Sequence, residues 1–110
     1  MNLDEVKDYI RENLPEFYTQ QTIDFLSFIF KFYQNGMICF KLFDKKFEEI
    51  SSVSGMFNEC YADGRNLIIL IGDRNKEYYK LIIPIKGMNI PGFGNITLNK
   101  EIYTIGFSYA

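Results

Sequence analysis

The chain has 110 residues, is 47% hydrophobic and 24% charged, and carries a formal net charge of −2. This size and composition predict one compact domain spanning 1–110, and they exclude a disordered tail, a collagen-like fibre and a second domain that closes over a substrate. The basic residues form no stripe along the chain, so we expect no direct nucleic-acid binding.

The N-terminal segment has the pattern of an amphipathic helix. Asn2 is a good N-cap, and Glu5 stands three residues later, as in a capping box. Pro15 disfavours helical geometry at the residue before it and should end the helix there. The apolar stripe at spacings of three and four consists of Leu3, Val6, Ile10 and Leu14.

The next apolar segment admits two interpretations. Alternating aromatic residues before Asn35-Gly36 are typical of a β-hairpin. Such a hairpin would pair Lys31 with Phe40 and mix charged with large apolar side chains on each face, which argues against it. A helix over 19–34, with Asn35-Gly36 as its C-terminal cap, leaves one narrow polar stripe. Its apolar band is too wide for packing on one side only, so the helix should be central or part of an interface.

After Gly36 the pattern changes to strands joined by short turns. We expect a loop at 51–55, an edge or bulge at Pro84, and close approach of a helix over the small side chains of Thr104, Gly106 and Ser108. The expected fold class is α+β, with two N-terminal helices packed on a mainly antiparallel meander of about five strands. Strand-like patterns occupy 37–43, 47–53 (a weaker strand or a short helix), 56–61, 67–71, 77–86, 96–98 and 101–109.

The two cysteines and the apolar runs bear on the compartment. Cys39 lies in an apolar run and is expected to be a small buried hydrophobe. The first residues are acidic, unlike those of a secretory signal, and no apolar run approaches the roughly twenty residues that span a bilayer. We therefore expect a cytoplasmic protein with reduced thiols and no membrane association.

Catalytic patterns are largely missing. The chain has no His, which removes the commonest general base and metal ligand, and its two cysteines are too far apart in sequence for a zinc site. We expect no catalytic residues, no metal and no cofactor. One alternative is a metal-dependent nuclease, which needs clustered acids with a Lys close by. Nothing else in the sequence indicates that such a cluster forms from Asp63, Asp73, Glu77 and Lys80.

Two surfaces are candidates for binding a partner. Residues 1–30 contain six acidic against two basic residues, and Asp4, Asp8 and Glu12 share the outward face of the first helix. The loop 87–95 contains three Gly and one Pro and offers Ile90 and Phe93 as apolar anchors. The alternatives are a merely solvated helix face and a connecting loop whose Phe93 packs into the core.

These observations favour a non-catalytic protein-binding module that acts by steric and electrostatic occlusion. The abundance of Ile, Lys and Asn indicates an AT-rich coding sequence, which suggests a phage or mobile element as the source. The role expected from such a source is that of an anti-defence inhibitor (of the anti-CRISPR type) or an immunity protein. The alternative is a small-ligand-binding domain with an aromatic pocket between the second helix and the sheet. A surplus of Phe and Tyr also suggests a homodimer.

Overall fold

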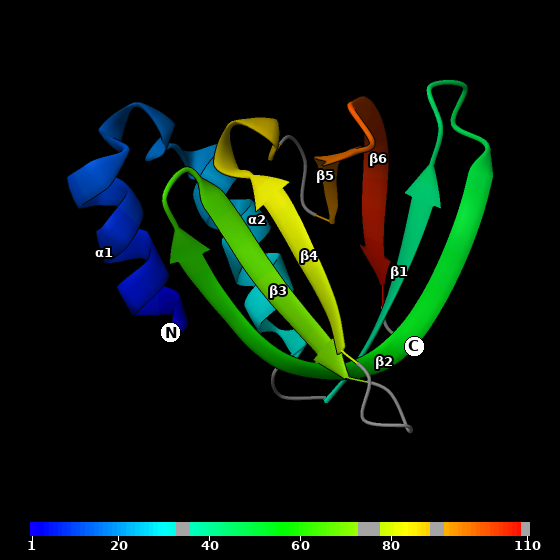
Figure 1. The fold of residues 1–110 in the computed structure, drawn as a ribbon. Coiled ribbons are helices and arrows are strands. Elements are labelled where there is room, and N and C mark those ends of the chain that lie inside the picture. Colours follow the sequence, from blue (N-terminus) through cyan, green and yellow to red (C-terminus); the bar gives the residue numbers. More distant parts are fainter. Residues whose placement is uncertain (33–35, 73–77, 89–91, 109–110) are drawn as a thin grey trace.

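In the computed structural model, which describes residues 1–32, 36–72, 78–88 and 92–108, two helices pack on one six-stranded antiparallel sheet (Figure 1). The strand order is β4-β3-β2-β1-β6-β5. This confirms the α+β class, with six strands in place of five. The helical elements are α1 (Leu3–Asn13), the 3-10 turn η1 (Pro15–Phe17), α2 (Gln20–Phe30) and the 3-10 turn η2 (Ile85–Gly87). The strands are β1 (Met37–Phe43), β2 (Glu49–Asp63), β3 (Asn66–Gly72), β4 (Tyr78–Pro84), β5 (Phe93–Leu98) and β6 (Glu101–Ser108).

Helix α1 begins and ends as its sequence predicts. The Asn2 side chain accepts a hydrogen bond from the Glu5 amide, and the Asn2 amide donates to the Glu5 carboxylate, which completes the capping box. The helix ends at Asn13, two residues before Pro15. Its apolar stripe is buried at Val6 and Ile10, so this stripe attaches the helix to the core.

Helix α2 is central to the core. Thr19 caps its N-terminus through its side chain, and the helix ends at Phe30, earlier than expected. The expected cap at Asn35 lies outside the described residues, while Gly36 has the positive φ of +74° that suits a residue following a helix. Phe25, Leu26 and Ile29 have no exposed surface, so the centre of the wide apolar band is buried within this chain, while Phe28 and Phe30 are half-buried.

Strand β2 corrects the expected loop at 51–55. These residues belong to one continuous strand of 15 residues. Its first half pairs with β1 up to Met37↔Met56, and its second half pairs with β3 from Met56↔Gly72 onward. The serines that suggested a loop are compatible with a strand because Ser52 and Ser54 are exposed beside solvent. Figure 1 shows β2 as a strongly bent strand shared by the two halves of the sheet.

The bend of β2 curls the sheet around its inner face. Phe40 of β1 and Tyr79 of β4 are separated by two strands in the sheet order, yet their ring centroids lie 6.0 Å apart. The edge strands also approach each other, because a Cβ on Gly94 of β5 would lie 3.2 Å from the Ile83 side chain of β4. The core therefore lies inside a curled sheet that packs on α2, not beneath a flat one.

Gly106 of β6 is covered by aromatic rings and Ser108 is exposed, which corrects the expected helix contact. A Cβ on Gly106 would lie 2.9 Å from the ring of Phe93 and 3.3 Å from that of Phe43. The close approach of α2 occurs instead just before β5, where a Cβ on Gly92 would lie 3.3 Å from the Phe28 ring. Two aromatic rings thus occupy the space that the sequence assigned to a helix.

Pro84 lies at the edge of the sheet, as expected. Strand β4 is the outermost strand on its side, and the Ile85 amide donates to the Arg65 carbonyl. Since amides along an antiparallel strand point alternately toward and away from the neighbouring strand, the nitrogen of Pro84 points away from β3. The missing N–H of proline therefore removes no bond of the sheet.

Candidate functional site

The acidic face of α1 is the first candidate surface. Asp4, Asp8 and Glu12 are all exposed, and their spacing of four places them along one side of the helix. Asp8 forms an ion pair with Arg11 in the next turn, which reduces the negative charge at the middle of the row. Within the described part of the chain, Asp4 and Glu12 form no ion pair, so the row stays acidic at both ends.

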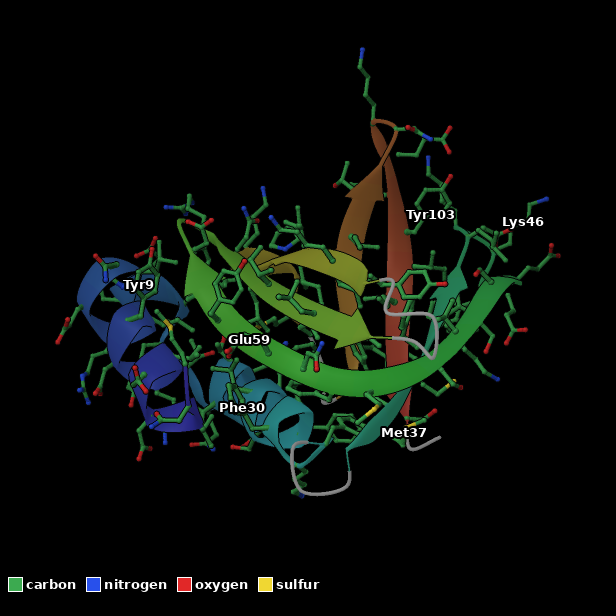
Figure 2. All side chains as sticks on the ribbon, turned by 60° about the horizontal axis from the view of Figure 1, so that its bottom comes forward. Tyr9, Phe30, Met37, Lys46, Glu59 and Tyr103 are labelled. Carbon is green, nitrogen blue, oxygen red and sulfur yellow. The ribbon has the colours of Figure 1, made fainter. Side chains whose placement is uncertain are left out.

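Two contacts fix α1 and the residues before it against the second half of β2 and the β2–β3 turn. The Tyr9 hydroxyl donates to the Gly64 carbonyl at 2.9 Å, and the amino group of Met1 lies 2.9 Å from the Glu59 carboxylate. Figure 2 labels Tyr9 and Glu59, which lie at the interface between this helix and the sheet. The hydrogen bond to Glu59 raises the pKa of the Met1 amino group. The acidic row is therefore presented on a helix that is held at both its first and middle turns.

The second candidate surface, the loop 87–95, is only partly described. Ile90 lies outside the described residues. Phe93 opens β5 and is half-buried, with its ring beside Gly106. It is neither fully buried in the core nor fully presented to solvent. The structure places it on a different element from the acidic row of α1.

An exposed aromatic pair beside this position was missed by the sequence reasoning. Phe43 and Phe47 stack with their ring centroids 5.6 Å apart and an interplanar angle of 27°, and Phe47 is 63% exposed. Phe47 lies within a turn in which the Asp44 side chain accepts hydrogen bonds from the backbone amides of Lys46 and Glu48, and the φ of Phe47 is +63°. The Asp44-Lys45-Lys46 turn was visible in the sequence, but no pattern indicated that the next ring would stack on Phe43.

Cys39 is less buried than expected. Cys39 is half-buried on β1 with its Sγ 3.7 Å from the Ser52 hydroxyl, whereas Cys60 is fully buried. Burial raises the pKa of the Cys39 thiol, but hydrogen bonds with Ser54, Ser52 and Ser108 outweigh it and hold that pKa below its ordinary value. Burial raises the pKa of Cys60 far above the ordinary range. The expectation was wrong because residue 39 alternates to the solvent face of β1.

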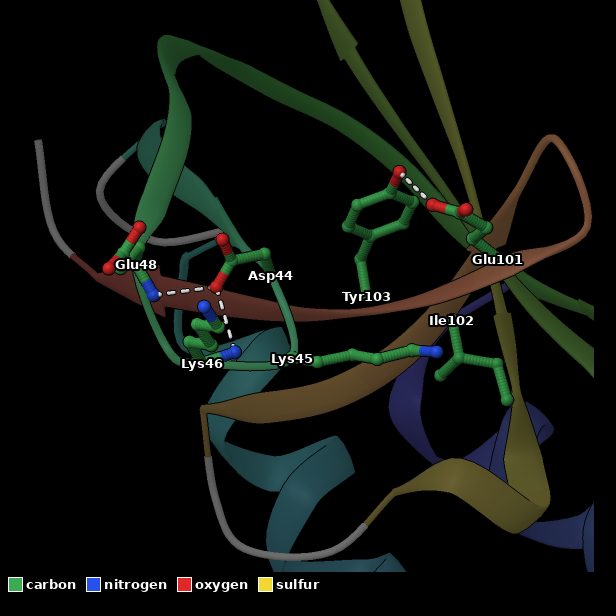
Figure 3. A pocket seen from close by; sticks show the side chains of 7 residues that line it. All are labelled: Asp44, Lys45, Lys46, Glu48, Glu101, Ile102 and Tyr103. Atoms are coloured by element: carbon green, nitrogen blue, oxygen red, sulfur yellow. Dashed lines mark hydrogen bonds between the residues drawn. The ribbon is translucent and has the colours of Figure 1, made fainter.

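A first cavity, of about 310 Å³, lies between the β1–β2 turn and the start of β6 (Figure 3). The Tyr103 hydroxyl donates to the Glu101 carboxylate at 2.9 Å, and this bond raises the pKa of Tyr103. Both signs of charge line the cavity, so it favours no single class of charged ligand. Its lining residues are Asp44, Lys45, Lys46, Glu48, Glu101, Ile102 and Tyr103.

A second cavity, of about 290 Å³, lies beside η1, η2 and the β2–β3 turn. Neither of these two cavities is lined by α2. The alternative of an aromatic pocket between α2 and the sheet stays a prediction, and Phe25 and Phe32 of this region are completely buried. The second cavity is lined by Phe17, Arg65, Asn66, Pro84 and Lys86.

The described ranges, 1–32, 36–72, 78–88 and 92–108, hold no group of three or more Cys, Asp or Glu side chains that could bind a metal. Of the acids considered for a nuclease, Asp63 is exposed at the end of β2, and Asp73 and Glu77 lie outside those ranges. Within the same ranges, no helix has the length and apolar character needed to cross a membrane.

The chain matches no known protein-family model, and no curated protein or solved structure is significantly similar to it. Its own residues and their geometry are therefore what bears on its function.

Proposed function

We propose that this chain is a non-catalytic protein-binding module that inhibits its partner by covering the partner's surface with the acidic face of α1. The observation that carries the proposal is the exposed row of Asp4, Asp8 and Glu12 on a helix that is anchored to the sheet. A preformed row of charge loses little conformational freedom on binding and attracts an oppositely charged surface over distance.

The partner of this proposal is a protein with a basic surface, including one that normally holds nucleic acid. An acidic row of this kind competes with phosphate groups for the same lysines and arginines. A phage or mobile-element origin, with the role of an anti-defence inhibitor or immunity protein, agrees with the composition of the chain. The exposed stacked ring of Phe47 supports a homodimer as a second mode of association.

The test is affinity capture from a lysate of a low-GC bacterium, followed by titration of the purified captured protein. Neutralising the row should weaken binding by about tenfold or more, since each exposed charge pair contributes up to about 1 kcal/mol. The association rate should also fall as salt rises. The test variant combines Asp4→Asn, Asp8→Asn and Glu12→Gln.

A matched control removes the same amount of charge elsewhere. It should bind as the unmodified protein does, because its three carboxylates lie on α2, the β1–β2 turn and the end of β2. Equal loss in both variants would show that net charge alone matters, and recovery of a self-associated species only would contradict the proposal. The control combines Asp24→Asn, Glu48→Gln and Asp63→Asn.

A further inference from the structure

Three separate parts of the chain meet around the second cavity, at one end of the sheet. Figure 1 shows η1, the β2–β3 turn and η2 together at this end. The walls are fixed by the backbone, because the Ile85 amide donates to the Arg65 carbonyl at 3.0 Å and the Tyr18 amide closes η1 on Pro15. The cavity of about 290 Å³ is therefore bounded by tied segments and is close in size to the smaller ligand pockets of proteins.

The charges that line this cavity are of one sign, although the whole chain is acidic. Arg65 and Lys86 are the charged lining residues, and no carboxylate lines the cavity. Lys86 forms no ion pair among the described residues. Outside the lining, the Glu16 carboxylate lies 3.5 Å from the Arg65 guanidinium, at the limit of a hydrogen bond.

The exposed Arg65 side chain contacts Phe17 and Glu16 and keeps most of its donors available. Its guanidinium lies over the Phe17 ring, with Cζ 5.4 Å from the ring centroid. The guanidinium carries five N–H donors, and the bond to Glu16 uses one of them. The planar fork of an arginine can bind two oxygens of a phosphate or carboxylate at once.

We propose that this cavity binds a small phosphate monoester, with the phosphate held between Arg65 and Lys86. Two cations from separate elements favour a doubly charged group over a singly charged one, and the Asn66 amide offers a further donor. Phe17 and Pro84 supply apolar walls for the organic part of the ligand. The site shares no residue with the acidic row of α1, so this inference stands or fails independently of the proposed protein partner.

The test follows the backbone amides of the full chain by NMR during titration with AMP, adenosine, inorganic phosphate, acetate or sodium chloride at equal ionic strength. AMP should shift the amides of Gly64, Asn66 and Lys86 in a saturable way, and phosphate should shift the same amides more weakly. Adenosine and sodium chloride should leave them unchanged. Acetate that binds as tightly as phosphate, or shifts that sodium chloride reproduces, would overturn the proposal.

Variants locate the binding at the two cations. Arg65→Gln and Lys86→Gln should each weaken AMP binding by about tenfold or more, the effect of losing one hydrogen bond to a charged group. Both side chains are exposed, so the fold should survive, which far-UV circular dichroism checks. Lys100→Gln, the same charge change at the exposed β5–β6 turn, is the control. An equal loss of affinity in this control would refute a localised site.

Discussion

Replacing Gly55 with Ala should destabilise the protein, because the bend of β2 leaves no room for a side chain. A Cβ on Gly55 would lie 2.4 Å from the Gly72 carbonyl oxygen and 2.6 Å from Cγ2 of Ile71. The first distance is about 1 Å shorter than an ordinary van der Waals contact of about 3.4 Å. The obstacle is backbone, so the end of β3 must move away from β2 at the Met56↔Gly72 pair.

Two opposing contributions set the size of this effect. Ala restricts the unfolded chain more than Gly does, which stabilises the folded state by about 0.4–1 kcal/mol. Overpacking against a fixed neighbour costs about 1–3 kcal/mol and sometimes more. With a backbone oxygen as the obstacle we take the upper part of that range, so the net loss is about 2 kcal/mol. For a domain of this length that corresponds to a fall in Tm of about 8 °C.

Urea unfolding followed by far-UV circular dichroism measures the loss, since the chain has no Trp to report by fluorescence. Gly106→Ala is the matched control: its Cβ would lie 2.9 Å from an atom of the Phe93 ring, and a side chain can turn aside. The control should cost about 1 kcal/mol or less, toward the lower end of the range for overpacking. If Gly55→Ala were as stable as the unmodified protein, or if Gly106→Ala lost as much, the explanation of the bend would be wrong.

Asn2→Ala removes the capping box of α1 and should cost about 1 kcal/mol in the same urea assay; an unchanged midpoint would mean that the cap contributes nothing. Cys39 should react with a thiol reagent in the folded protein, at a pH below that needed for a free cysteine, whereas Cys60 should react only on unfolding; rapid labelling of both would contradict their placement. Because burial raises the folded-state pKa of Cys60, stability should fall as pH rises above the thiol's ordinary value, and Cys60→Ala should lessen that fall. Phe25→Ala should cost about 3–5 kcal/mol, while Phe47→Ala, at an exposed ring, should cost far less in the same measurement.

Local chemistry allowed part of the fold to be predicted. The cap at Asn2, the burial of Val6 and Ile10 and the end of α1 before Pro15 depend on residues close in sequence, and all were confirmed. The central position of α2 followed from its wide apolar band. These features were predictable because the interactions that decide them lie within one helix or its immediate ends.

Features decided by strand pairing could not be predicted in the same way. Ser52 and Ser54 resemble loop residues until their pairing with β1 is known. The burial of Cys39 depends on which face of β1 it occupies, and the cover over Gly106 comes from Phe93 on a neighbouring strand. The acidic row of α1 was predictable because it is a helix face, whereas the cavity at Arg65 and Lys86 joins segments that are distant in sequence.

The pairing of β2 with both halves of the sheet has a consequence for how the protein unfolds. The strands on one side of the sheet join β2 through β1, which pairs only with its first half. Those on the other side join it through β3, which pairs only with its second half, so both groups depend on the same backbone. Neither group can detach cleanly, because melting either one exposes the hydrogen-bonding groups of a strand on which the other depends. The two ends of the sheet should therefore lose amide protection together, as one cooperative unit.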